Sequence, residues 1–498
     1  MSSTPTAGGR RPNVLVIMTD QHRANLMSCT GETLVPTPNI DRIAAAGVRF
    51  ENAYCPYPVC AASRASLLTG LYAHNTGVID NSDRLDWRFR TVAHHFAASG
   101  YLTALIGKMH FNHAHSHGFA YYMSINDWLM YLGPKVKHYA DEIANHPLSP
   151  NFFKTVYDTG AGFPDMDGLW DGPSPWVGNV TRRSFEHMAS ALEADDHLDM
   201  FVARESVKFM RAYRDQPFLL VCSFMKPHTP FYPPRAWAEK YPVDQVNLPA
   251  VGDVGQYPPH IQARIRSMER MDEGLRRAGW AGYLGNLAFV DTCVGHVYSE
   301  LEALGLREDT IVVYTSDHGE MGGEHGLFQK FCLFEPAARI PLIISHPGHV
   351  PAGRVTQALT EYLGLYPTLA NLAGTPAPDG TSIVDFSGAV QTLDGKDFSP
   401  IVRDPAQPGP AAVFSEFGLK AETPSYMIRT RRYKMIYHQG STHELYDLGT
   451  DPGETRNLAA DPAMGGVLKD LQEQLFAWYD PRTNRHRRAG PGVTATPR

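Results

Sequence analysis

Runs of consecutive apolar residues alternate with segments of helical periodicity along most of the chain. Residues 13–18 form one such run, and a run of this kind is typical of a strand covered on both faces. Comparable runs predict strands at 102–106, 218–221, 310–314 and 341–344. Apolar residues that recur every three or four positions predict helices at 39–47, 63–71, 183–213 and 283–304.

Strands separated by helices are typical of an α/β fold. We therefore predict a large, mostly parallel central sheet that is covered by helices on both faces. The pattern changes near residue 400, where short apolar runs follow one another with little helix between them and a helix at 464–479 comes last. This change predicts a small C-terminal α+β subdomain with an antiparallel sheet. Its strands are expected at 412–414, 426–428 and 434–437.

These patterns divide the chain into segments. A disordered tail is expected first, then the main α/β domain, the subdomain and a basic tail. Inside the main domain, an irregular stretch rich in aromatic residues and proline predicts an insertion that shapes the substrate pocket. The disordered tail is expected at 1–10, the main α/β domain at 11–404 with its insertion at 111–200, the subdomain at 405–485 and the basic tail at 486–498.

Charge and the N-terminus narrow the range of partners. The formal net charge of the 498 residues is −7, so no global basic field would attract nucleic acid or an anionic membrane surface. The apolar run at 14–18 is too short for a signal peptide or a membrane span. We therefore expect a cytoplasmic protein whose cysteines are reduced thiols. They are Cys29, Cys55, Cys60, Cys222, Cys293 and Cys332.

Polar side chains follow the predicted strands at the point where each strand ends. Ligands of open α/β sheets bind beyond the carboxyl ends of the strands, so these side chains are expected to meet in one site. A predicted helix N-terminus near Cys60 would add backbone N–H groups for an anion. The residues are Asp20 and Gln21 after the first strand, Lys108 and His110 after the second, Lys226 and His228 after the third, and Asp317 and His318 after the fourth.

This set of side chains suits a divalent cation next to an oxyanion. Two aspartates and an amide oxygen favour Ca²⁺ or Mg²⁺, while the imidazole of His318 shifts the preference towards Mn²⁺. Arg64 and Lys330 add positive charge that suits a sulfate or phosphate group. Taken singly, each residue also has a structural interpretation: Cys60 as a small buried apolar residue and Lys330 as a solvated surface charge.

Several motifs resemble one family. The stretch CAASRASLLTG, from Cys60 to Gly70, resembles the signature Cys/Ser-x-Pro/Ala-x-Arg, a helix and Thr-Gly of the type I sulfatases in the alkaline phosphatase superfamily. The resemblance covers nearly the whole chain and makes 11–404 the expected catalytic domain. The other matching segments are PNVLVIMTDQHR, TPNIDRIAAAGVRFENAYC, GKMHF, KPHTPF, YTSDHGEMGGEHGLFQK and ELYDLGTDPGETRNLA.

The resemblance implies a sulfuric ester hydrolase of the arylsulfatase type that cleaves a small-molecule sulfate ester. A formylglycine-generating or sulfatase-maturating enzyme would oxidise Cys60 to formylglycine, an aldehyde that hydrates to a diol. One hydroxyl would attack sulfur and displace the alcohol, which leaves a covalent sulfo-enzyme. Loss of the proton from the second hydroxyl would then expel sulfate and reform the aldehyde. Covalent catalysis of this kind divides one difficult step into two easier ones.

The resemblance also implies a role for each residue. One divalent cation, with Ca²⁺ favoured over Mn²⁺ or Mg²⁺, would be held by Asp20, Gln21, the Cys60-derived diol, Asp317 and His318. The catalytic side chains are expected to be Arg64 steadying the diol, Lys108 and Lys330 binding sulfate oxygens, His228 with Lys330 protonating the leaving oxygen, and His110 taking the proton of the second hydroxyl.

Two departures from the signature leave alternatives open. Ala62 stands where proline is commoner, which bears on the conversion of Cys60. Gln21 and His318 stand where many sulfatases have Asp and Asn, and this pair resembles choline sulfatases and phosphonate or phosphate ester hydrolases. A phosphonate monoester or phosphodiester hydrolase with the same machinery is therefore the alternative. An unmodified anion-binding protein is a third hypothesis, and the sequence leaves a homo-oligomer open.

Overall fold

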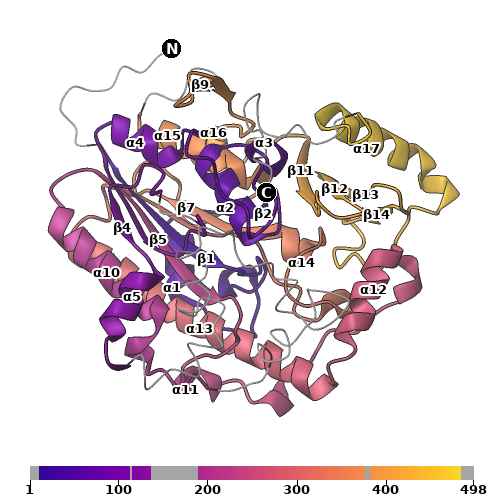
Figure 1. The fold of residues 1–498 in the computed structure, drawn as a ribbon, viewed down its shortest axis with the longest axis horizontal. Helices are drawn as coiled ribbons and strands as arrows, with labels where there is room; N and C mark the ends of the chain where they lie inside the picture. The colour runs from indigo at the N-terminus through magenta and orange to yellow at the C-terminus, as the bar shows by residue number, and fades with distance from the viewer. Residues whose placement is uncertain (1–10, 113–114, 136–184, 186–188, 376–381, 484–498) are drawn as a thin grey trace, which may run out of the picture.

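A computed structural model describes residues 11–112, 115–135, 185, 189–375 and 382–483 of the chain. Its centre is an eight-stranded sheet with helices on both faces (Figure 1). The strand order is β4-β3-β5-β1-β6-β7-β2-β8, and the neighbouring strands pair in parallel except at β6–β7 and β7–β2. Within this sheet β7 therefore runs against the other strands, and the predicted large, mostly parallel sheet is confirmed.

The strands of the central sheet include the predicted ones and three that were not predicted, β2, β4 and β8. Their bounds are β1 (Asn13–Asp20), β2 (Val48–Tyr54), β3 (Leu102–Gly107), β4 (Tyr121–Met123), β5 (Phe218–Pro227), β6 (Thr310–Ser316), β7 (Arg339–Ser345) and β8 (Arg354–Glu361).

The two faces of the sheet are both buried, as the unbroken apolar run of β1 predicts. Leu15 and Ile17 pack into a core with α1, α10 and α13, whereas Val14 and Val16 pack into a second core with α2, α4, α15 and α16. The helices are α1 (Pro38–Ala45), α2 (Cys60–Thr69), α3 (Ala73–Thr76), α4 (Val92–Ala98), α5 (Ile125–Leu132), α10 (Leu198–Tyr213), α11 (Arg235–Ala238), α12 (Pro259–Met268), α13 (Glu273–Ala303), α14 (Glu335–Ala338), α15 (Leu365–Leu372) and α16 (Ser399–Arg403).

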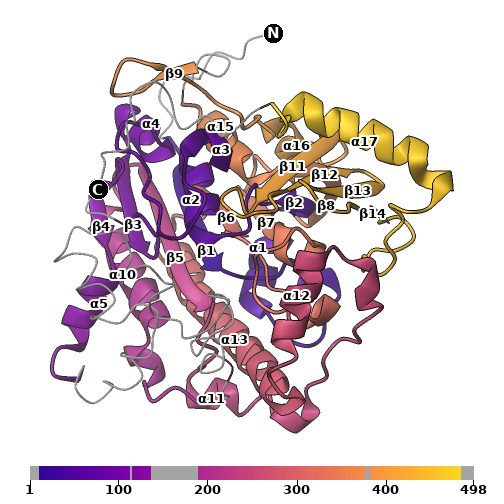
Figure 2. The same cartoon turned by 45° about the vertical axis from the view of Figure 1, so that its right-hand side comes forward.

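The C-terminal part forms the predicted antiparallel sheet. Its four strands pair in sequence order, and α17 (Gly465–Trp478) packs across them (Figure 2). Tyr57, Val59 and Ala62 of the main part pack into the same apolar core as this sheet, so the two parts share a buried boundary. The strands are β11 (Ala412–Phe417), β12 (Ser425–Thr430), β13 (Tyr433–His438) and β14 (Glu444–Asp447), and a separate hairpin holds β9 (Ser382–Val384) and β10 (Val390–Thr392).

Several expectations meet the limits of the described residues. The tails at 1–10 and 486–498 and much of the 111–200 insertion lie outside them, so the domain boundaries stay predictions. All six cysteines are free thiols in the described structure. Among the described helices, none has both the length and the apolar character that crossing a bilayer requires. The compartment stays a prediction.

Candidate active site

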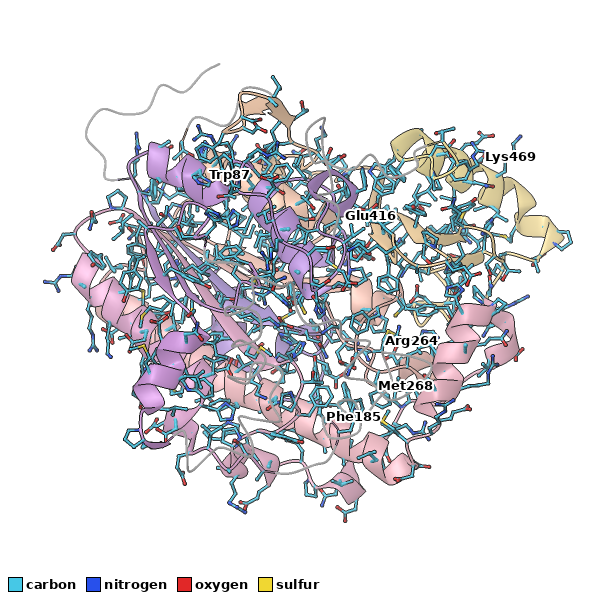
Figure 3. The ribbon with its side chains drawn as sticks, in the orientation of Figure 1. Trp87, Phe185, Arg264, Met268, Glu416 and Lys469 are labelled. Carbon is cyan, nitrogen blue, oxygen red and sulfur yellow. The ribbon has the colours of Figure 1, made fainter. Side chains whose placement is uncertain are left out.

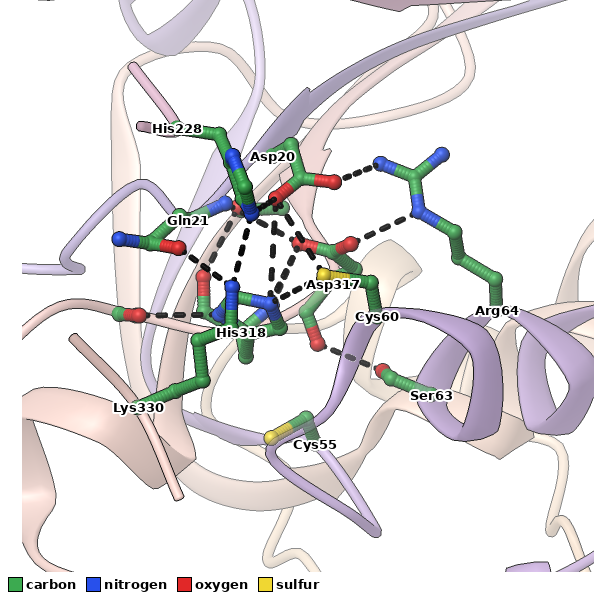
Figure 4. A network of polar contacts seen from close by, with 12 residues as sticks. Asp20, Gln21, Cys55, Cys60, Ser63, Arg64, His228, Asp317, His318 and Lys330 are labelled. Carbon is green, nitrogen blue, oxygen red and sulfur yellow. Dashed lines mark hydrogen bonds and ion pairs between the residues drawn. The ribbon is translucent and has the colours of Figure 1, made fainter. Parts of the chain in front are cut away.

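The predicted site residues come together beyond one edge of the sheet. Figure 4 shows most of them in one network of polar contacts: Asp20, Gln21, Cys60, Arg64, His228, Asp317, His318 and Lys330. β1, β3, β5 and β6 run in the same direction, so the segments that follow them meet at the same edge. β2 also runs in this direction, because two antiparallel pairings separate it from β6, and it leads into α2. The sheet topology thus explains why residues from five distant parts of the sequence meet.

Helix α2 begins earlier than the sequence predicts. It starts at Cys60 and not at 63, and its N-cap residue, Val59, makes no side-chain capping hydrogen bond. Cys60 therefore lies in the first turn and Arg64 in the second, whereas a helix that began at 63 would have Arg64 in its first turn. Residues four positions apart share one face of a helix, so the spacing of Cys60 and Arg64 directs both side chains into the site.

Arg64 links the two aspartates of the site. Its side chain is 1% exposed, and its guanidinium donates to Asp20 Oδ2 at 2.9 Å and to Asp317 Oδ2 at 2.7 Å. Burial and the neighbouring Asp20 carboxylate raise the pKa of Asp317 to about 6. Ser63 Oγ also donates to the backbone oxygen of Asp317 at 2.5 Å. Arg64 thus keeps two like charges together in the protein interior.

Four side chains form a group with the geometry of a cation site. Sγ of Cys60 lies 3.2 Å from Nε2 of His318 and 3.7 Å from Oδ1 of Asp20. Nδ1 of His318 contacts the backbone oxygen of Gly319 at 3.0 Å, which leaves Nε2 as the ring atom that faces the group. Their four ligand atoms lie within 4.8 Å of one another: those of Asp20, Cys60, Asp317 and His318.

The donor chemistry of this group fits a divalent cation. Carboxylate oxygens and an imidazole nitrogen suit Ca²⁺, Mg²⁺ or Mn²⁺. The group is anchored by Gly319, where an added Cβ would lie 2.0 Å from the backbone oxygen of Pro336, so only glycine fits. A divalent cation would therefore be held by Asp20, Asp317 and His318, with the side chain at position 60 beside it.

Gln21 reaches the site from a backbone conformation that is rare for a residue with a side chain. Its φ angle is 71°, in the left-handed region. The backbone is held on both sides: its N–H donates to Asp317 Oδ1 at 3.1 Å, and its oxygen accepts from the Tyr283 hydroxyl at 2.8 Å. Its side-chain Oε1 accepts from Lys330 Nζ at 2.7 Å. The strained backbone conformation thus directs the side-chain amide of Gln21 towards Lys330.

Arg64, Lys108 and Lys330 bring three positive charges to the site around Cys60. Lys108 Nζ lies 2.7 Å from Asp20 Oδ2. Burial by itself would raise the pKa of the Cys60 thiol, but Lys108, Lys330 and His318 lower it well below its usual value. A bound divalent cation would add further positive charge. Such a site is suited to an oxyanion.

Two histidines complete the site. Burial together with Lys330 and Lys108 lowers the pKa of His228 to about 4. Burial lowers the pKa of His110 as well, although its hydrogen bond to Cys60 opposes the shift. The structure brings together every residue assigned to the site, but it does not bring in Lys226, whose Nζ donates to the backbone oxygen of Pro230 at 2.7 Å.

Two residues near the site were not predicted. Tyr283 lies on α13 and gives no sequence signal, because an aromatic residue on a buried helix is ordinary core. Glu320 follows His318 by two positions in the segment SDHGE, so its place beside other site residues was a usable signal. Its carboxylate accepts a hydrogen bond from Gln21 Nε2 at 2.5 Å.

The fold places a possible cation site among basic side chains at the carboxyl edge of the sheet, an arrangement suited to an enzyme that acts on an oxyanion ester. Comparison with known families makes this more specific. The chain belongs to the sulfatase family, whose members hydrolyse sulfate esters, because the family model matches residues 12–375. A second model, described as N-sulphoglucosamine sulphohydrolase, C-terminal, matches residues 323–480.

Known relatives agree with this assignment. The chain is 30% identical over 469 residues to the choline-sulfatase of Rhizobium meliloti, which covers 91% of this chain and 83% of the relative. It is 27% identical to an arylsulfatase of Clostridium perfringens, with 90% of both chains covered. The solved phosphonate monoester hydrolase of Agrobacterium radiobacter shares the fold, with a TM-score of 0.74, 24% identity and coverage of 95% and 96%.

Proposed function

We propose that the protein hydrolyses organic sulfate monoesters to an alcohol and sulfate, with a formylglycine at position 60 and one divalent cation. The observation that carries the proposal is the position of Cys60. Its sulfur lies in the first turn of α2, 3.2 Å from His318 Nε2 and among Lys108, Lys330 and Arg64. A nucleophile at this position would face both the cation and the anionic substrate.

The cation and the modified residue supply the chemistry that the unmodified chain lacks. When bound, the cation polarises a sulfate oxygen and acidifies the hydrated formylglycine, which provides the nucleophilic hydroxyl and a second hydroxyl for sulfate release. Asp20, Gln21, Asp317 and His318 would hold the cation, for which Ca²⁺ is favoured over Mn²⁺ or Mg²⁺. Arg64 would steady the diol.

The remaining side chains would bind sulfate and move protons. Lys108, which contacts Asp20, and Lys330, which contacts Gln21, would bind sulfate oxygens. His228 and Lys330, which are in contact, would act together to protonate the leaving oxygen of the alcohol, with the transferable proton on Lys330. His110, which hydrogen-bonds to Cys60, would take the proton of the second hydroxyl. The proposal requires a formylglycine-generating or sulfatase-maturating enzyme as a partner.

A second candidate is a phosphonate monoester or phosphodiester hydrolase that uses the same site. The presence of Gln21 and His318 in the ligand set favours it, because these two residues replace the Asp and Asn of many sulfatases. A substrate panel separates the two functions: 4-nitrophenyl sulfate, choline sulfate, phenyl phosphonate monoester and an aryl phosphodiester. The sulfatase proposal predicts the highest kcat/KM on a sulfate, and a higher value on the phosphonate would overturn it.

The modification is tested by mass spectrometry of the intact peptide across position 60. Formylglycine is lighter than cysteine by about 18 Da. In protein co-expressed with a maturating enzyme, the lighter form is expected together with activity. The Cys60→Ala variant should lose turnover while its free energy of unfolding changes by about 1 kcal/mol or less. A fully unmodified thiol in active protein would contradict the proposal.

A further inference from the structure

The side-chain amide of Gln21 lies between a carboxylate and an ammonium group. Its Nε2 donates to Glu320 Oε2 at 2.5 Å, and its Oε1 accepts from Lys330 Nζ at 2.7 Å. We propose that Glu320 is a positioning residue that fixes the Gln21 amide with its oxygen towards the cation site and Lys330. This inference rests on the proposed function, because it concerns the cation that the site would hold.

Glu320 is itself fixed. It is fully buried, and its Oε1 accepts from the backbone N–H of Gly322 at 3.0 Å and of Gln329 at 2.5 Å. These two donors occupy one oxygen and leave Oε2 for Gln21. The NH₂ side of the amide faces Glu320, whose Oε2 accepts the hydrogen bond.

The same carboxylate also orders the segment that carries Lys330. Gln329 precedes Lys330, and besides its bond to Glu320 it accepts from the backbone N–H of Met321 at 2.8 Å. Gln329 and Phe331 both have left-handed backbones, with φ angles of 64° and 73°. A conformation of this kind needs support from its surroundings. Glu320 thus connects both partners of the contact between Gln21 and Lys330.

The backbone of Gln21 is fixed, so the orientation of its side-chain amide is what its neighbours still have to determine. Its backbone N–H is held by Asp317 and its backbone oxygen by Tyr283. If the amide turned over, its NH₂ group would face Lys330 and the cation, which both require an acceptor. Polar groups behind a metal ligand orient the ligand in this way, and their loss typically weakens metal affinity about 10–100-fold.

The Glu320→Gln variant tests this inference because it keeps the shape of the side chain at position 320 and replaces one of its two acceptor oxygens by an NH₂ donor. Its oxygen would stay with the two backbone N–H groups, so its new NH₂ would face Gln21 and make that amide turn. We expect the affinity for Ca²⁺, and separately for Mn²⁺, to fall about 10–100-fold. The measurement is calorimetric titration of full-length protein stripped of cations, together with the cation-induced shift in Tm.

A double variant should reverse the loss. In Gln21→Glu with Glu320→Gln, the new amide at position 320 would donate to the new carboxylate at position 21, which again offers oxygen to Lys330 and the cation. Recovery of cation affinity in the double variant supports the proposal. Equal affinity in the wild type and Glu320→Gln overturns it, as does failure of both variants to fold. If the single variant alone fails to fold, a folded double variant that binds the cation supports the proposal.

Glu335→Gln provides the matched control. Glu335 is another buried carboxylate, but it contacts Tyr54 at 2.9 Å and Lys434 at 3.2 Å, away from Gln21. This variant should lower Tm without changing cation affinity, which separates positioning from general destabilisation. A wild-type protein that binds no divalent cation would overturn the proposed function itself. Cation binding that is unaffected by Glu320→Gln would overturn only the role of Glu320.

Discussion

Lys330 and His228 are in direct contact, with 2.9 Å between Nζ of the lysine and Nε2 of the histidine. An ammonium group only donates, so Nε2 of His228 accepts in this contact. The proton of the neutral ring is then on Nδ1, which lies 2.6 Å from the backbone oxygen of Thr229. In this arrangement, the proton nearest the site is carried by Lys330.

The contact predicts how the loss of Lys330 depends on the substrate. A 4-nitrophenolate leaves without much help, whereas an alkoxide needs a proton, and general acid catalysis is typically worth about 10²–10⁴-fold. Lys330→Met should therefore lower kcat/KM more for an alkyl sulfate than for 4-nitrophenyl sulfate. Steady-state kinetics on both esters provide the measurement. Equal losses on both would show that Lys330 binds the sulfate group and does not supply the proton.

Arg64 predicts a change in stability. Removing one partner of a buried ion pair leaves an uncompensated charge and typically costs about 3–5 kcal/mol. Arg64→Met leaves Asp20 and Asp317 buried together, so its free energy of unfolding should fall by this amount in denaturant titrations. An added divalent cation should restore part of the loss, since it brings positive charge to the same carboxylates.

A surface arginine provides the control for Arg64. Arg432 contacts Asp447 at 2.7 Å, but its side chain is 60% exposed. Exposed ion pairs contribute little, so Arg432→Met should not change the unfolding midpoint measurably. A similar decrease in the free energy of unfolding of both variants would mean that the contribution of Arg64 to stability does not come from its burial.

Arg264 predicts an effect on the Lys330 segment from outside the site. It lies on α12 (Figure 3), and its guanidinium donates to the backbone oxygens of Phe328 at 2.9 Å and Phe331 at 2.8 Å, and to that of Lys330. Lysine cannot reproduce this fork of donors. Since small misplacements can cost up to about 100-fold, Arg264→Lys should reduce kcat/KM by about 10–100-fold. Arg266→Lys, on the same helix but exposed, should retain full activity.

Much of the site could be predicted because it follows from the order of the strands. Asp20, Lys108 and Asp317 each come within three residues of the end of an apolar run, and parallel strands place their carboxyl ends at one edge. The unbroken apolar runs also predicted a sheet covered on both faces. No side-chain contact is needed for either inference.

Other features depended on contacts that a local pattern does not contain. β2 (Val48–Tyr54) has Arg49, Glu51 and Asn52 among its apolar residues, and its register shifts between Phe50 and Ala53, so it lacks a clear period. The start of α2 was predicted three residues too late, at 63, because Val59 is not a capping residue. The bond between Gln21 and Glu320 joins positions that are 299 residues apart, and no periodicity indicates it.

The pair His74 and Glu416 predicts a pH dependence of stability. His74 is on α3, and Glu416, which is labelled in Figure 3, is on β11, so the pair joins the main part to the C-terminal sheet. Nδ1 of His74 lies 2.9 Å from Glu416 Oε2, and the histidine side chain is only 12% exposed, so solvent screens the pair weakly. Burial opposes protonation, but Glu416 outweighs it and raises the pKa of His74.

The sign of the effect follows from this shift. A folded-state pKa above the unfolded value of about 6.5 means that the pair stabilises the protein fully below that pH and loses its contribution as the pH rises through the folded value. The free energy of unfolding of the wild type should therefore exceed that of His74→Gln most at about pH 5.5 and least at about pH 9. Denaturant titrations at a series of pH values measure this difference. In a Glu416→Gln background the His74→Gln substitution should show no such pH dependence, and a difference that grows with pH in the wild-type background would show that His74 is bound as the neutral ring.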